Sequence, residues 1–193
     1  MMIKTFINIL KQLFTPINYL RINHPLKSWF DIYIPLFLTV ITVSILFFLP
    51  HTPAVFGEGS IVFMITDLIK ILVGFYIASL AAIATFPRVE MDELISGDSA
   101  TLVVERRGKL KTIELTRRRF LCYLFGYLAF VGMFLYFSGS AASMLKSSFQ
   151  ELISPTYLLW IKWVFISGFT FITFNLFITT LLGLHYMTDR IHR

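Results

Sequence analysis

The chain has 193 residues, a mean hydropathy of +0.75 and a formal net charge of +6; 56% of its residues are apolar, 17% aromatic and only 15% charged. A water-soluble core of one domain cannot bury so much apolar surface, so this composition excludes an ordinary soluble domain and predicts a membrane protein. The Lys and Arg residues lie mostly beside apolar segments, which is typical of membrane topology rather than of nucleic-acid binding.

Residues 1–28 are expected to form an amphipathic segment at the membrane interface. Residues 2–14 carry apolar side chains at helical three-and-four spacing with polar side chains opposite, and this helix is too short to span a bilayer. Lys4 and Lys11 would face anionic lipid headgroups, and Pro16 would end the helix.

Four later segments are apolar and long enough to cross a bilayer, and they predict an all-α membrane protein built from two transmembrane hairpins. The hairpins are residues 29–86, with spans at about 29–49 and 61–86, and residues 120–184, with spans at about 120–145 and 157–184. Asp31 would remain at the wet boundary of the first span. A polar loop, residues 87–119, joins the hairpins, and residues 185–193 form a tail.

Positive charge sets the expected orientation. Four Lys and Arg residues lie in the N-terminal segment, eight in the central loop and two in the tail, whereas loops 50–60 and 146–156 hold none and one. The positive-inside rule therefore places both termini and the central loop of a multi-pass membrane protein in the cytoplasm.

Asp67, Lys70 and Asn175 are polar residues inside the predicted spans that could lie at membrane depth. Charges at membrane depth are costly, so these residues could line a conduction or gating pathway. Alternatively, Asp67 and Lys70 share one helical face near the headgroups and neutralise each other. Gly74, Ala78 and Ala82 recur every four residues, a stripe that lets another helix approach closely.

The central loop holds half of all charged residues and two short β-prone runs. They predict a β-hairpin at 101–115. A three-residue loop would set Glu105 opposite Lys109, and a two-residue loop at 107–108 would give another register; both remain open. An isolated hairpin is marginal in water, so this one needs a partner: helix ends, a neighbouring subunit or another protein.

The charged side chains of the loop predict a docking surface for a soluble cytoplasmic protein, with the exposed strand edges inviting strand addition. The predicted docking residues are Glu90, Asp92, Glu93, Glu105, Arg106, Arg107, Lys109, Lys111 and Glu114. Arg117, Arg118 and Arg119 adjoin the third span and are expected to fix topology and contact anionic lipid. Acids interrupt the bases and no aromatic residue occurs before Phe120, so direct nucleic-acid binding is not expected.

Catalytic and metal-binding patterns are not found in the sequence. No nucleophile–base pair or phosphate-binding glycine loop occurs, and the four histidines are scattered. Cys122 is the single cysteine, which excludes an intrachain disulfide and favours a packing role. We therefore expect a protein that is not an enzyme and uses no cofactor and no metal.

The chain length, the four spans, the leader Ile3–Phe14 and the segment Glu90–Thr116 between two hairpins together resemble the KwaA family. These are the membrane subunits of the bacterial anti-phage system Kiwa. The resemblance implies an inner-membrane oligomer that responds to phage-related membrane disturbance and engages a soluble DNA-acting partner, KwaB. It also implies that Glu90–Thr116 is the docking and relay surface, and it assigns no role to any single residue.

The leading hypothesis is therefore a non-enzymatic membrane sensor or scaffold that signals to a cytoplasmic effector through residues 87–119. A small oligomeric pore lined by Asp67, Lys70 and Asn175 is one alternative. An assembly subunit of a larger membrane complex is another.

Overall fold

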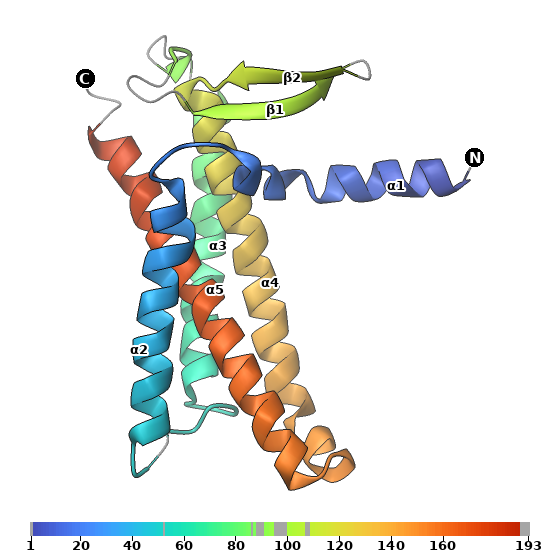
Figure 1. Ribbon diagram of the computed structural model, residues 1–193, viewed down its shortest axis with the longest axis vertical. Helices are drawn as coiled ribbons and strands as arrows, with labels where there is room; N and C mark the ends of the chain where they lie inside the picture. Colours follow the sequence, from blue (N-terminus) through green and yellow to red (C-terminus); the bar gives the residue numbers. More distant parts are fainter. Residues whose placement is uncertain are drawn as a thin grey trace.

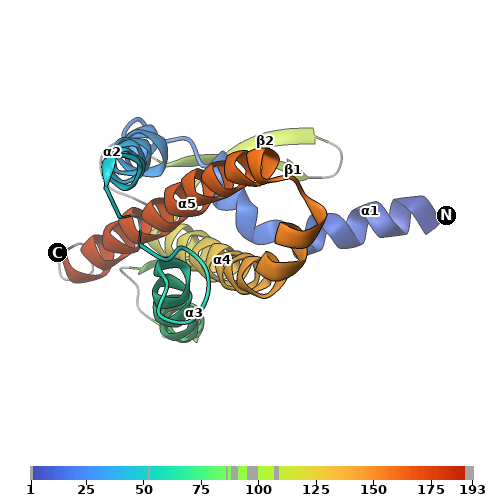
Figure 2. The same ribbon diagram turned by 90° about the horizontal axis from the view of Figure 1, so that it is seen from below.

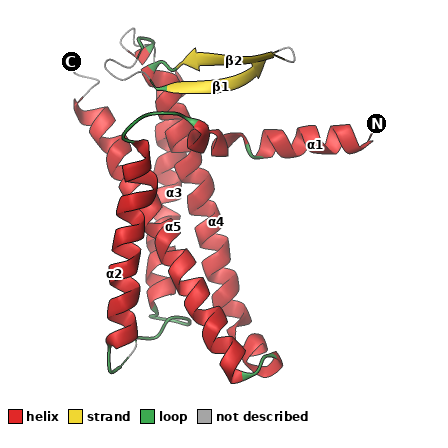
Figure 3. Cartoon of the chain, viewed as in Figure 1, coloured by secondary structure: helices red, strands yellow, loops and turns green. Residues whose placement is uncertain are grey.

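The computed structural model of the chain describes residues 2–51, 53–85, 87, 91–94, 100–106 and 109–189. Within these residues are four helices long and apolar enough to cross a membrane and one two-stranded sheet (Figures 1 and 3). The long helices are Trp29–Phe48 (a π-helical start, η2, Trp29–Tyr33, followed by α2, Ile34–Phe48), α3 (Ile61–Thr85), α4 (Arg117–Leu152) and α5 (Pro155–Asp189). The chain is thus a multi-pass membrane protein by the length and composition of its helices.

The last two helices are longer than the predicted spans. α4 continues through polar residues to Leu152, so the predicted loop 146–156 shrinks to the short link 153–154 before α5. Lys, Gln and Glu are good helix formers, and hydropathy marks the end of the apolar stretch rather than the end of the helix. α5 likewise continues past residue 184 into the predicted tail.

The helices pack in the order α3, α4, α5, α2, with α5 between α2 and α4 (Figure 2). α2 and α3 are consecutive in sequence but do not pack together as the predicted first hairpin. The loop between them reverses at Gly57 and Gly59, whose φ angles of 108° and 70° suit glycine. An apolar cavity of about 380 Å³ lies among α2, α3 and α5.

Close packing of α3 on α4 depends on glycines of α4. A Cβ atom added at Gly139 would lie 2.6 Å from Cγ2 of Thr66, and one at Gly132 would lie 2.7 Å from Cγ2 of Val73. Gly74 and Ala78, by contrast, are exposed, and Ala82 is only partly buried. The small-residue stripe therefore does not pack α3 within the chain, and its contact with a second copy stays a prediction.

Three other parts of the chain gather at one end of the bundle (Figure 1). Helix α1 (Met2–Leu13) runs across the long axis, and a 3₁₀ helix, η1 (Thr15–Arg21), connects it to the bundle. Strands β1 (Thr101–Arg106) and β2 (Lys109–Glu114) lie at the same end, as does the end of α5. This arrangement is compatible with both termini and the central loop on one side of a membrane.

Substitution of Gly139 by Ala is expected to destabilise the fold by about 1–3 kcal/mol, because the new methyl group would overlap short, branched side chains. Its surroundings include Thr66, Val62 and Phe169. Thermal unfolding in detergent, followed by circular dichroism, measures the loss. Gly126→Ala is the matched control, since a Cβ there meets nothing within 4 Å; equal effects of the two variants would contradict the proposed close packing.

Candidate functional site

The candidate site centres on Asp31, at the start of the first membrane helix. Its main-chain carbonyl cannot receive the usual helical hydrogen bond from four residues ahead, because that residue is Pro35 and has no N–H. Here the helix is locally widened, and the N–H of Ile34 bonds to the carbonyl of Trp29, five residues back. The amide Nδ2 of Asn175, on α5, donates to the Asp31 carbonyl at 2.8 Å and replaces the missing donor.

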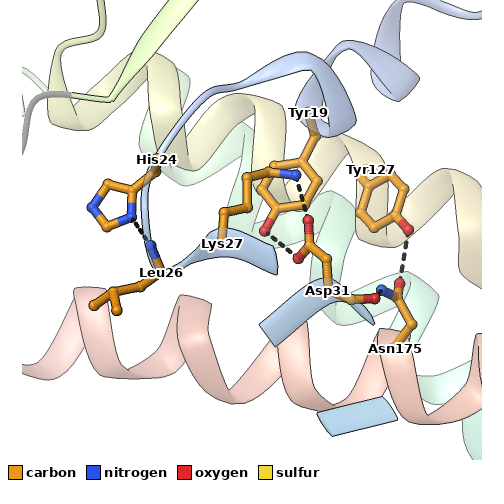
Figure 4. A network of polar contacts seen from close by, with 7 residues as sticks. All are labelled: Tyr19, His24, Leu26, Lys27, Asp31, Tyr127 and Asn175. Carbon is orange, nitrogen blue, oxygen red and sulfur yellow. Dashed lines mark hydrogen bonds and ion pairs between the residues drawn. The ribbon is translucent and has the colours of Figure 1, made fainter. Parts of the chain in front are cut away.

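The Asp31 carboxylate is also fully engaged (Figure 4). The Tyr19 hydroxyl, on η1, donates to Oδ1 at 3.1 Å, and the Lys27 ammonium forms an ion pair with Oδ2. Lys27 Nζ also lies 4.5 Å from the centre of the Tyr19 ring, a cation–π contact. Burial, then the charge of Asp31, raises the pKa of Tyr19 well above its usual range, so this hydroxyl remains a donor.

Tyr127, on α4, completes the group. Its ring stacks on Tyr19 with centroids 4.8 Å apart, and its hydroxyl donates to Oδ1 of Asn175 at 2.7 Å. We name this group the Asp31 cluster; its members are Tyr19, Lys27, Asp31, Tyr127 and Asn175. It joins residues 15–28, which together with α1 we call the leader from here on, to the first membrane helix, α4 and α5, and Asp31 itself is 5% exposed.

Asp31 is therefore buried within the protein, which the sequence did not predict, and its position at the membrane boundary stays a prediction. Its charge is compensated inside the protein by partners that fold back from the leader, so burial is tolerated. A pocket of about 570 Å³ lies beside the cluster, lined by Lys27, Asp31, Tyr127 and Asn175 among others. Nearby His24 serves the local turn, where Nδ1 accepts from the N–H of Leu26 at 3.3 Å (Figure 4).

The leader also holds the β-hairpin. The N–H of Asn23 donates to the carbonyl of Thr101 at 2.9 Å, and the N–H of Thr101 donates back at 3.1 Å. Leu102 and Leu115 are buried at 2% and 1% exposure. The helix ends and leader thus supply the partner that a lone hairpin needs.

Strand pairing selects one of the two predicted registers. Arg106 faces Lys109 and Glu105 faces Leu110, which corresponds to the two-residue connection at 107–108. The three-residue alternative, with Glu105 opposite Lys109, is wrong. Because Thr101 pairs with Asn23, its backbone N–H and carbonyl point away from β2. Hydrogen-bonded and non-hydrogen-bonded pairs alternate along an antiparallel ladder, and this alternation favours the observed register.

Two predicted docking acids are used within the chain. Asp92 forms a two-point ion pair with Arg118, at 2.8 Å and 3.3 Å, and Arg118 also donates to the carbonyl of Ile83 at 2.7 Å. Arg117 lies 3.9 Å from Glu93, and its N–H donates to the Glu93 carbonyl. These arginines, predicted to contact lipid, fasten the segment after α3 onto the start of α4.

The other described residues predicted to dock a partner or to contact lipid lie at the same end of the helix bundle. Lys111 and Glu114 are exposed on β2, and Arg119 is exposed on α4. Glu105, Arg106 and Lys109 lie in the strands, and Lys4 and Lys11 lie in α1. Glu90 and Arg107 lie outside the described residues.

The three polar residues proposed to line a pathway do not meet within the chain. Lys70 pairs with Asp67 at 2.7 Å, and both side chains are about half exposed on the outside of α3. Asn175 is buried in the Asp31 cluster instead. The mutual neutralisation considered from the sequence is therefore confirmed as an ion pair.

Sequence reasoning missed Tyr19, Lys27 and Tyr127 as site residues. One signal could have identified the site: a proline four residues after an aspartate leaves that carbonyl in need of another donor. The described residues include no group of three or more side chains able to hold a metal ion. The cluster is suited to holding helices in register, since its polar groups satisfy one another.

The four long apolar helices have the length and composition of a multi-pass membrane protein, and the Asp31 cluster joins the leader to the bundle through polar contacts. Comparisons with protein families, with curated proteins and with solved structures find no match to this chain.

Replacing Asp31 by Asn should destabilise the protein by about 3–5 kcal/mol, because Lys27 would be left charged and buried without its partner. The double variant Lys27→Met/Asp31→Asn removes both charges and should recover much of that loss. Thermal unfolding of both variants in detergent measures the coupling. Asp67→Asn is the control, since its ion pair is exposed and should matter little; a double variant as unstable as the single one contradicts the pairing.

Proposed function

We propose that this protein is a non-enzymatic sensor or scaffold of a bacterial inner membrane that responds to membrane perturbation and engages a soluble cytoplasmic effector through residues 87–119. One observation carries the proposal: the short leader is bonded to both the bundle and the hairpin. Tyr19 and Lys27 hold Asp31 within the bundle, while Asn23 pairs with Thr101 of β1. Movement of the leader would therefore change its contacts with both the bundle and the hairpin.

Helix α1 is the proposed sensing element. It lies across the bundle axis, and Met2, Phe6 and Leu13 expose most of their apolar side chains, at 86%, 61% and 62% (Figure 1). Such side chains would insert into the headgroup region of a bilayer. A change in lipid packing or thickness would alter the depth of α1 and shift the population between two positions of the leader.

The hairpin is the proposed output. Thr101 directs its backbone groups toward the leader, so by alternation Thr112 and Glu114 direct theirs away from β1. Among the described residues no strand pairs with this part of β2. An effector could add a strand here and read the exposed charges of Lys111 and Glu114.

The resemblance to the KwaA family extends the proposal to anti-phage defence, with KwaB as the effector, membrane lipids as the stimulus and a homo-oligomer as the working form. The shared end of α1, the hairpin and α5 supports a cytoplasmic location for both termini. The pore alternative is less well supported, because Asp67 and Lys70 neutralise each other on an exposed face of α3, whereas Asn175 is buried among other partners.

Phe6→Glu should uncouple the sensor, because a charge on the apolar side of α1 opposes its insertion. An environment-sensitive dye on Lys111→Cys, in a Cys122→Ala background, would report the hairpin in liposomes of increasing acyl-chain length. The dye emission should shift with bilayer thickness in the parent chain and stay constant in Phe6→Glu. Gln12→Glu adds the same charge to the same helix as the control; loss of response in both variants, or in neither, contradicts the mechanism.

The docking proposal is tested by co-purification of cytoplasmic proteins with the detergent-solubilised chain. Removal of residues 100–115 should abolish capture of the effector, and the charge exchange Lys111→Glu/Glu114→Lys should weaken it without altering net charge. Asp67→Asn, remote from the hairpin, should leave capture intact. An unchanged partner profile after removal of the hairpin would falsify the docking surface.

A further inference from the structure

A groove lies at the end of the bundle opposite to the hairpin. Its volume is about 480 Å³, and its walls come from the last turns of α4, the first turns of α5 and the loop 53–56. Apolar side chains make up most of the lining, including Phe149 of α4 and Phe165 of α5. Phe165 also packs against Phe56 of the loop, with ring centroids 5.4 Å apart, so the loop is fixed against the helix.

Two lysines, Lys146 and Lys162, line this otherwise apolar groove. Lys162 is half-buried, and Gln150 is the remaining strongly polar side chain of the lining, which contains no carboxylate. Among the described residues neither lysine forms an ion pair. The groove therefore combines two uncompensated positive charges with an apolar floor, which suits a molecule with an anionic head and a hydrocarbon tail.

The surroundings place the groove at headgroup depth. Tyr157 and Trp160 lie on the same first turns of α5 as Leu158 and Ile161 of the lining, and they are 69% and 68% exposed, as aromatic residues are at a membrane interface. Lipids of that leaflet are therefore the molecules that reach the groove at high local concentration. A zwitterionic lipid carries its own positive group, whereas a net anionic phospholipid leaves its phosphate free for both lysines.

We propose that this groove binds one anionic phospholipid from the leaflet opposite to the hairpin, with its phosphate between Lys146 and Lys162 and an acyl chain along Phe149 and Phe165. The site does not depend on the proposed sensing function. It would fasten the α4–α5 turn and the loop 53–56 to the lipid surface, and so give the bundle a fixed depth at its far end.

Quenching of tryptophan fluorescence by brominated lipids tests the site. In a background in which all three native tryptophans are replaced by Phe, Phe149→Trp places a single tryptophan in the lining of the groove. The purified chain is reconstituted with brominated phosphatidylglycerol or brominated phosphatidylcholine at equal mole fraction. We expect phosphatidylglycerol to be preferred by about fivefold to thirtyfold, which corresponds to about 1 kcal/mol for each of one or two lysine contacts with anionic lipid.

Charge variants assign that preference to the groove. The preference should disappear in Lys146→Gln/Lys162→Gln and persist in Lys146→Arg/Lys162→Arg, which also shows that the site tolerates substitution. Lys111→Gln removes a positive charge at the other end of the bundle and should change nothing. Equal quenching by the two lipids in the parent chain, or an undiminished preference in the double Gln variant, overturns the proposal. Stronger quenching by brominated oleate than by brominated phosphatidylglycerol would overturn it in favour of a free fatty acid.

Discussion

A buried carboxylate must be compensated, and this requirement organises one end of the molecule. Asp31 is 5% exposed, so its charge must meet partners inside the protein, and these come from the leader that precedes it. Its carbonyl has a separate need, created by Pro35 and met by Asn175. One residue thereby fixes the leader and α5 at the same point, and the packing of Tyr127 against Tyr19 adds α4.

The helices differ in how they are held. α3 and α4 approach closely at Gly132 and Gly139, where added methyl groups would overlap their neighbours. The first membrane helix packs against α5, and an apolar cavity separates it from α3. Its position therefore depends on this packing against α5 together with the polar bonds of the Asp31 cluster.

The hairpin acquires stability from the same leader. Its buried side chains, Leu102 and Leu115, and the backbone bonds between Asn23 and Thr101 replace the third strand that a free hairpin lacks. Asp92 and Arg118 hold the chain that leads into it. The described charged residues of the central loop, 87–119, thus fall into two groups. Some fasten the hairpin to the bundle, and others, such as Lys111 and Glu114, are exposed.

The sequence by itself determined the four membrane helices, the leader helix and the two strands, because each depends on the periodicity and hydropathy of neighbouring residues. Only the tertiary structure decided the helix order, the hairpin register and the partners of Asp31. The stripe at Gly74 looked suited to packing, yet Gly132 and Gly139 hold the close contact, since helical spacing does not say which face meets a neighbour. Asp31 looked solvated because Tyr19 and Asn175, 12 and 144 residues away, could not be paired with it until the chain was folded.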